Sequence, residues 1–133
     1  MPLGDNERHA VVSYRLEKAE STLIEAKDCG KMGHWTLAAN RLYYADYYAC
    51  SALLIEKGLQ AKTHEGTIGM IGLHFIKTGI LHKESGTMLA RLLSMRHTGD
   101  YDDFIDWEQE DVEPYFQQVE VFLSTVGQLI SSS

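Results

Sequence analysis

The chain contains few of the residues that interrupt helices or cross-link small folds. Its 133 residues include two prolines, one of them at position 2, and two cysteines, Cys29 and Cys50. Scarce proline favours helices over a sheet rich in turns. Two cysteines do not make a disulfide scaffold, so we expect reduced, mostly buried thiols in a cytoplasmic protein.

Long hydrophobic runs are also missing. The longest nearly apolar run covers residues 49–55, whereas a helix that spans a bilayer needs about 20 apolar residues. The N-terminal residues lack the basic and then apolar layout of a signal peptide. We therefore expect a cytoplasmic protein with no membrane partner.

Basic residues are absent from the C-terminal part of the chain. Residues 100–133 carry nine acids and no Lys or Arg, whereas residues 1–99 carry twelve bases and ten acids. The net charge of −7 argues against broad nonspecific binding to nucleic acid but allows a small basic site before residue 100. The acidic stretch 100–113 is either a solvated loop and helix start or a docking surface for a basic partner.

The composition and hydrophobic periodicity are those of one helical domain. Hydrophobic residues make up 44% of the chain and charged residues 23%, so we expect a single domain over residues 1–133 with its core at about 7–130. Apolar spacing with a period of 3.6 predicts helices over 7–29, 34–57, 64–77, 83–97 and from about 111 onward. The predicted fold is an all-α, antiparallel bundle of four to five helices.

A first candidate site lies in the second predicted helix, in the sequence Asn40-Arg41-Leu42-Tyr43-Tyr44-Ala45. Steps of three and four residues place Arg41, Tyr44 and Tyr48 on one helix face. Arginine and tyrosine side chains can hold a phosphate and stack on a base. In the alternative interpretation the tyrosines only pack, and Arg41 pairs with an acid, for example one from residues 100–113.

A second candidate site follows the fourth predicted helix. Arg96 and Asp100 share one face if the helix continues past the glycine between them, and Tyr101 then points near the same place. In a functional interpretation Arg96 stabilises the charge of a phosphate, while His97 or His64 moves a proton. The alternative is an Arg–Asp pair that only joins two helices.

Metal chemistry is not indicated. The six histidines show no His-Glu-x-x-His pattern and no paired Glu-x-x-His pattern, and the two cysteines form no Cys-x-x-Cys. We expect no metal site and no cofactor.

Several of these motifs together resemble the HEPN-domain proteins, in particular their small stand-alone prokaryotic branch. The resemblance covers about residues 7–130 and adds three stretches to those quoted above: Ser51-Ala52-Leu53-Leu54, Lys62-Thr63-His64-Glu65-Gly66 and His74-Phe75-Ile76-Lys77-Thr78-Gly79-Ile80. It implies a helical bundle, a homodimer, and a link to RNA or nucleotides. It also implies a minimal nucleotidyltransferase as partner in a toxin–antitoxin pair.

The resemblance also implies a catalytic motif. Active toxins of this family carry an Arg, then four to six residues, then a His. Two copies of this motif meet across a dimer and cleave RNA without a metal. The arginine of that motif matches Arg96, but residues 101–103 are Tyr, Asp and Asp. His97 is adjacent to the arginine and so lies outside the motif spacing, and in the enzyme alternative either His97 or His64 would replace the missing base. The favoured hypothesis is therefore a binding module, with an active endoribonuclease toxin and a purely structural bundle as alternatives.

Overall fold

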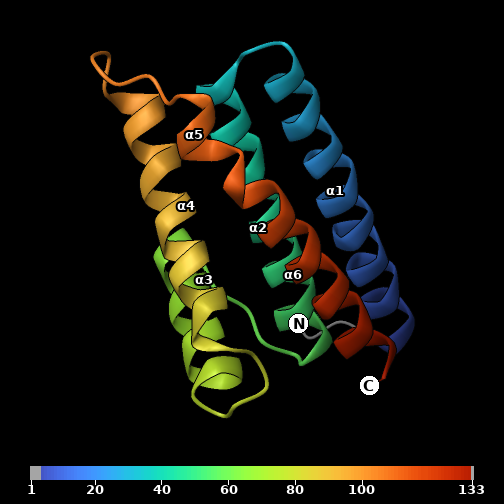
Figure 1. Cartoon of the computed structure of the whole chain (residues 1–133). Helices are drawn as coiled ribbons and strands as arrows, with labels where there is room; N and C mark the ends of the chain where they lie inside the picture. The colour runs from blue at the N-terminus through green and yellow to red at the C-terminus, as the bar shows by residue number, and fades with distance from the viewer. Residues whose placement is uncertain (1–3, 133) are drawn as a thin grey trace.

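The structure, a computed structural model, describes residues 4–132 as a bundle of helices (Figure 1). Those residues contain no strand, which confirms the predicted all-α bundle. The predicted domain boundaries at 1 and 133 lie outside the described residues. The helices in chain order are α1 (Asp5–Lys31), α2 (Trp35–Glu56), α3 (His64–Ile71), a π-helical turn η1 (Gly72–Ile76), α4 (Lys83–Tyr101), α5 (Gln109–Val112) and α6 (Pro114–Ser131).

Helix α2 is the centre of the bundle. It packs against α1, α4 and α6, and in Figure 1 α6 lies across its front while α1 and α4 flank it. Small side chains let these neighbours approach closely, and four alanines of α2 are buried together with Leu42: Ala38, Ala45, Ala49 and Ala52. Because three sides of α2 are covered, its solvent-facing residues form a narrow row.

Two glycines near the end of α1 have different roles. Gly33 adopts a φ of +80° after the helix has ended, a backbone conformation that glycine reaches without steric cost. Gly30 lies inside α1, although the first helix was predicted to end at residue 29. A Cβ at Gly30 would come within 2.9 Å of the Trp35 ring, so glycine is required there by close packing.

The third predicted helix, 64–77, is not continuous. Thr63 begins α3 by accepting a hydrogen bond on Oγ1 from the backbone N–H of Gly66 at 2.8 Å. From Gly72 the backbone widens into η1, where the N–H of Lys77 donates to the carbonyl of Gly72 at 2.9 Å. This bond spans five residues rather than four, which is the spacing of a π-helical turn.

Helix α4 continues four residues beyond its predicted end at residue 97 and reaches Tyr101. The helix continues through Gly99. The glycine at this position allows α4 to pack closely against α2 and does not mark a helix end. A Cβ at Gly99 would lie 2.9 Å from Cγ2 of Thr36. The extension keeps Arg96 and Asp100 on one helix and therefore on one face.

The last predicted helix divides in two. Pro114 has no N–H to donate, and its ring excludes a carbonyl in the preceding turn, so α5 ends at Val112 and α6 begins at the proline. Trp107 anchors the loop that precedes α5: its Nε1–H donates to the Met95 carbonyl at 2.9 Å, and its backbone N–H donates to Thr36 Oγ1 at 2.9 Å.

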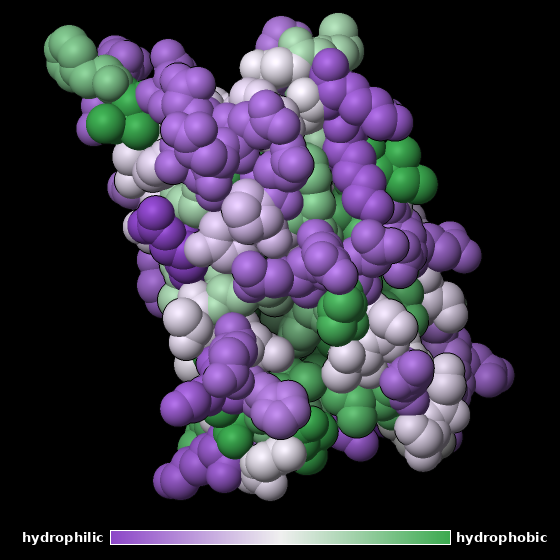
Figure 2. Space-filling view, viewed as in Figure 1, coloured by the Kyte–Doolittle hydropathy of each residue, from purple (hydrophilic) through white to green (hydrophobic). Residues whose placement is uncertain are grey.

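The surface in Figure 2 is polar over most of its upper half and carries several hydrophobic areas, two of which can be assigned to elements of the fold. One is the outer end of the loop after α4, where Phe104 is 97% exposed. The other lies between α4 and α6, where Met88, Val121 and Phe122 help to line a hollow of about 770 Å³. No helix among residues 4–132 has the length and apolar content to cross a bilayer.

Candidate functional site

The solvent-facing row of α2 carries tyrosines and an arginine. Arg41, Tyr44, Tyr47 and Tyr48 are each partly exposed. Neighbouring rings are close: the ring centroids of Tyr44 and Tyr48 lie 6.0 Å apart, and those of Tyr44 and Tyr47 lie 6.3 Å apart. We call these four residues the tyrosine row.

Two guanidinium groups from different helices meet at one ring of this row. Cζ of Arg41, on α2, lies 5.3 Å from the Tyr44 ring centroid, and Cζ of Arg96, on α4, lies 5.7 Å from it. Arg96 also donates from Nη1 to the Tyr44 hydroxyl at 3.1 Å. Its side chain is 15% exposed, and its buried Nε has no hydrogen-bond partner among the described residues. The two arginines expected from the sequence therefore converge.

A polar network connects the same two arginines. Asn40 accepts hydrogen bonds on Oδ1 from Nε and Nη2 of Arg41, at 3.1 and 2.8 Å, and donates from Nδ2 to the Asp100 carboxylate at 3.1 Å. Asp100 lies 3.9 Å from Arg96 Nη1. Asn40 was not singled out from the sequence as a site residue. The one feature of the sequence that could have indicated Asn40 is its position next to Arg41. In the structure its side chain points toward α4 and contacts Asp100.

The acid that pairs with Arg41 is Glu25 of α1, with Oε1 3.5 Å from Nη1. The suggestion that it pairs with an acid of the 100–113 stretch is wrong, because Asp100 faces Asn40 instead. Glu25 is 59% exposed, and an ion pair so open to water contributes little free energy. A bound anion can therefore displace it.

His64, at the start of α3, lies against the same rings. Its ring centroid is 4.7 Å from that of Tyr47 and 5.5 Å from that of Tyr43, and its Nδ1 is 2.5 Å from the Tyr43 hydroxyl. Burial, reinforced by the positive charge of Arg96, lowers the pKa of His64 below its usual 6.5. The ring is therefore neutral at neutral pH. Burial also raises the pKa of the Tyr43 phenol, which stays protonated.

His97 and Tyr101 lie apart from this cluster. Their rings contact each other, with centroids 4.9 Å apart, and Tyr101 is 70% exposed. Tyr101 was expected to point toward the Arg96 site. The five residues that separate it from Arg96 rotate it by about 140° around the helix, and this turns it away.

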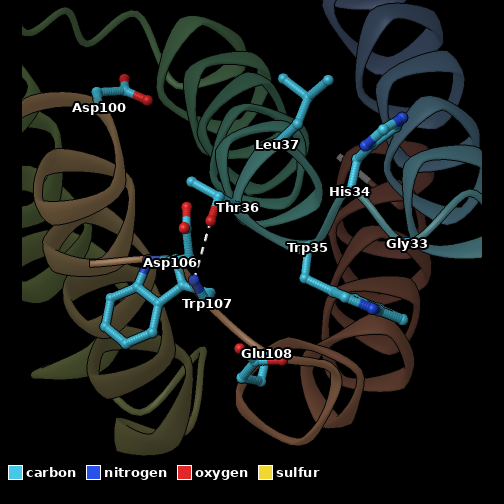
Figure 3. Close-up of a pocket in the computed structure, with 9 residues that line it drawn as sticks. All are labelled: Gly33, His34, Trp35, Thr36, Leu37, Asp100, Asp106, Trp107 and Glu108. Carbon is cyan, nitrogen blue, oxygen red and sulfur yellow. Dashed lines mark hydrogen bonds between the residues drawn. The ribbon is translucent and has the colours of Figure 1, made fainter. Parts of the chain in front are cut away.

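A hollow of about 660 Å³ adjoins Asp100 at the N-terminal end of α2, and neither Arg41 nor Arg96 is among the residues that line it. Figure 3 shows the carboxylates of Asp100, Asp106 and Glu108 around it, together with the bond from Trp107 to Thr36. Three carboxylates repel a phosphate. An anionic ligand is therefore expected at the tyrosine row rather than in this hollow.

Comparison with known proteins assigns the family. The sequence model of the HEPN domain matches residues 12–129. The chain belongs to the HEPN family. A Thermotoga maritima relative named UPF0332 protein is 36% identical over 94% of this chain and 95% of its own length. Two Methanocaldococcus jannaschii relatives, each named a "putative toxin", are 30% and 31% identical over 88% and 84% of this chain and 80% and 82% of their own lengths.

In this HEPN chain the arginine and the histidine of the cluster come from different helices. Arg96 is on α4 and His64 is on α3, and both contact the rings of Tyr43 and Tyr44. Residues 101–103, the positions at which the motif spacing would place a histidine, are exposed. The cluster contains the elements of a phosphate-binding site: two cations, phenol hydroxyls and a neutral imidazole.

Proposed function

We propose that this chain is a toxin–antitoxin type HEPN module that binds a phosphate group of a nucleotide or of RNA at Arg41, Tyr44 and Arg96. The convergence of the two guanidinium groups on the Tyr44 ring, at 5.3 and 5.7 Å, carries this proposal. Guanidinium groups bind phosphate oxygens through two parallel N–H donors. The tyrosine rings beside them offer a surface on which a base stacks.

The proposal includes a homodimer and a minimal nucleotidyltransferase as partner. The names of the two Methanocaldococcus jannaschii relatives support a toxin role. The acidic segment after α4 supports a basic protein partner, because it would repel RNA. Sedimentation equilibrium of the chain alone tests the dimer, and an average mass that stays that of a monomer at high concentration refutes it.

Binding of a labelled hexaadenylate, followed by fluorescence anisotropy, tests the phosphate site. Arg41→Gln combined with Arg96→Gln should weaken binding about tenfold or more, since both cations at the Tyr44 ring are removed. Lys27→Gln combined with Lys31→Gln is the matched control: the charge change is the same, and Lys27 pairs with Glu120 on α6, away from the row.

The same experiment separates binding from a purely structural role. Thermal unfolding of the Arg41→Gln/Arg96→Gln variant measures how far the two cations support the fold. Lost binding with unchanged unfolding supports the binding module. Lost folding, with no binding by the unmodified chain, supports the structural bundle.

An active metal-independent endoribonuclease is the second candidate, and His64 favours it. A general base must be unprotonated at working pH, and His64 is, because its pKa is lowered. The base would be Nε2, in the tautomer whose Nδ1–H donates to the Tyr43 hydroxyl. Arg96 would stabilise the charge that develops on the phosphorus oxygens.

RNA cleavage in the presence of EDTA tests this candidate. His64→Gln and Arg96→Ala should each lower the cleavage rate by about 10² or more, as loss of a general base or of a charge stabiliser does. Cleavage that persists in both variants, or that the unmodified chain lacks, refutes the enzyme.

A further inference from the structure

The tyrosine row continues beyond the two arginines, to a second group of cations on α1. Cζ of Arg15 lies 5.7 Å from the Tyr48 ring centroid, and Nζ of Lys18 lies 5.9 Å from it. Tyr48 is thus flanked by two cations from α1, while Tyr44 is flanked by Arg41 and Arg96. Two cationic side chains therefore lie beside each of the two rings.

The antiparallel packing of α1 and α2 produces this arrangement. Figure 1 shows the two helices side by side, joined by a short turn. Positions 15, 18 and 25 share one face of α1 at steps of three and seven residues. Glu25 contacts Arg41 at one end of the row, so Arg15 and Lys18 lie two to three turns further along, beside Tyr48.

The positive charge at Tyr48 is not balanced within the described chain. Neither Arg15 nor Lys18 forms an ion pair with any carboxylate among residues 4–132. The buried Nε of Arg15 has no hydrogen-bond partner there, as is also the case for Nε of Arg96. Two cations held at one ring without a counter-ion attract an anion.

We propose that Arg15, Lys18 and Tyr48 form a second phosphate subsite, so that the ligand of this face is a single-stranded RNA segment of about three nucleotides rather than a mononucleotide. This rests on the proposed phosphate site at Arg41 and Arg96. Arg41 and Tyr48 are seven residues apart, or about 10 Å along the helix. Three stacked nucleotides at about 3.4 Å each cover that length.

The chemistry of the row suits a single strand. Exposed aromatic rings that alternate with cations bind unpaired bases by stacking and the backbone by charge, with little preference for sequence. A duplex hides the faces of its bases inside the stack, so the tyrosines would have no base to contact. In the described chain two carboxylates pair with cations of this face, Glu25 with Arg41 and Asp100 with Arg96, and neither pairs with Arg15 or Lys18 at the Tyr48 end.

Two probes, 5′-labelled hexaadenylate and adenosine 5′-monophosphate, test the second subsite. In Arg15→Gln/Lys18→Gln the dissociation constant of hexaadenylate should rise about tenfold or more, because two phosphate contacts are lost. The slope of log affinity against log salt should shrink by about 1.4, since each contact with a single strand contributes about 0.7. The affinity for the monophosphate should stay within about twofold, which also shows that the variant is folded.

A second variant and a control make the result specific. Tyr48→Leu keeps both cations and removes the stacking surface, so it should weaken hexaadenylate binding about fivefold or more. Lys27→Gln/Lys31→Gln removes the same charge from the opposite face of α1 and should bind as the unmodified chain does.

The outcomes separate the two proposals. If the unmodified chain binds neither probe, the phosphate site at Arg41 and Arg96 is refuted, and the second subsite with it. If it binds both probes equally tightly, or if Arg15→Gln/Lys18→Gln binds hexaadenylate normally, only the second subsite is refuted. If the Lys27→Gln/Lys31→Gln control loses as much affinity for hexaadenylate as Arg15→Gln/Lys18→Gln, the loss is an effect of net charge. That outcome would also refute the second subsite.

Discussion

Replacing Asp46 with asparagine removes a carboxyl group that is completely buried in the middle of α2. The Cys50 thiol is its one hydrogen-bond partner in the described chain, with Sγ 3.7 Å from Oδ1, and Oδ2 has none. Burial raises the pKa of Asp46 to about 8, and the bond from Cys50 opposes this shift. The carboxyl is therefore protonated, and uncharged, in the folded protein at neutral pH.

This protonation makes stability depend on pH with a defined sign. In the unfolded chain an aspartic acid loses its proton near pH 4, whereas folded Asp46 keeps its proton until about pH 8. Between these values the folded state binds one more proton than the unfolded state. The stabilising effect of a protonated Asp46 is complete below pH 4 and is lost as the pH rises. The loss is about 1.4 kcal/mol of unfolding free energy per pH unit.

Urea unfolding at pH 5, 6 and 7, followed by circular dichroism at 222 nm, measures this slope. From pH 5 to 7 the unmodified protein should lose about 3 kcal/mol relative to Asp46→Asn. The comparison is a difference, because other groups of the chain titrate in both proteins and their contributions cancel. Cys50→Ser is a useful control, since a serine hydroxyl still donates to Asp46 and the carboxyl remains titratable. That variant should keep a slope of the same sign.

A pH-independent difference between the unmodified protein and Asp46→Asn over this range would refute the reasoning. It would mean that Asp46 is ionised in the folded state, and hence that the centre of α2 is reached by water or by a counter-ion. The reasoning would also be refuted if the unmodified protein gained unfolding free energy relative to Asp46→Asn as the pH rises. That result, too, would mean that Asp46 is ionised in the folded state.

Three further substitutions test the packing by urea unfolding. Gly69→Ala should stabilise the protein by about 0.5–1 kcal/mol, because a Cβ there meets nothing within 4 Å; destabilisation would contradict this. Gly30→Ala should destabilise it by about 1–3 kcal/mol, because its Cβ would lie 2.9 Å from the Trp35 ring; a gain in stability would show that the ring moves freely. Trp107→Phe should cost about 1–3 kcal/mol, because the Met95 carbonyl loses its donor; no change would mean that water replaces the indole N–H.

The sequence predicted the helices well because each prediction rests on local periodicity. The second predicted helix, 34–57, differs from α2 by one residue at each end. The errors occur where a glycine has a tertiary role. Gly99 permits close contact of α4 with α2, and Gly30 makes room for Trp35. A glycine that ends a helix and a glycine that allows close packing look the same in a sequence.

The candidate site was predictable in part. Helical spacing placed Arg41, Tyr44 and Tyr48 on one face, and the structure has them there. Spacing also predicted that Arg96 and Asp100 share a face, at 3.9 Å. Tyr101 packs against His97 instead, because five helical positions rotate it by about 140° from Arg96.

The sequence by itself determined the all-α fold, the HEPN family and the two arginines, since helix periodicity and short motifs depend on residues near one another in the chain. Only the tertiary structure decided which side chains surround those arginines. His64 reaches Tyr43 across 21 positions and Asn40 reaches Asp100 across 60. Arg15 and Lys18 meet Tyr48 because α1 folds back antiparallel on α2. Such contacts depend on how the helices pack, and packing is set by all the buried faces together rather than by any one segment.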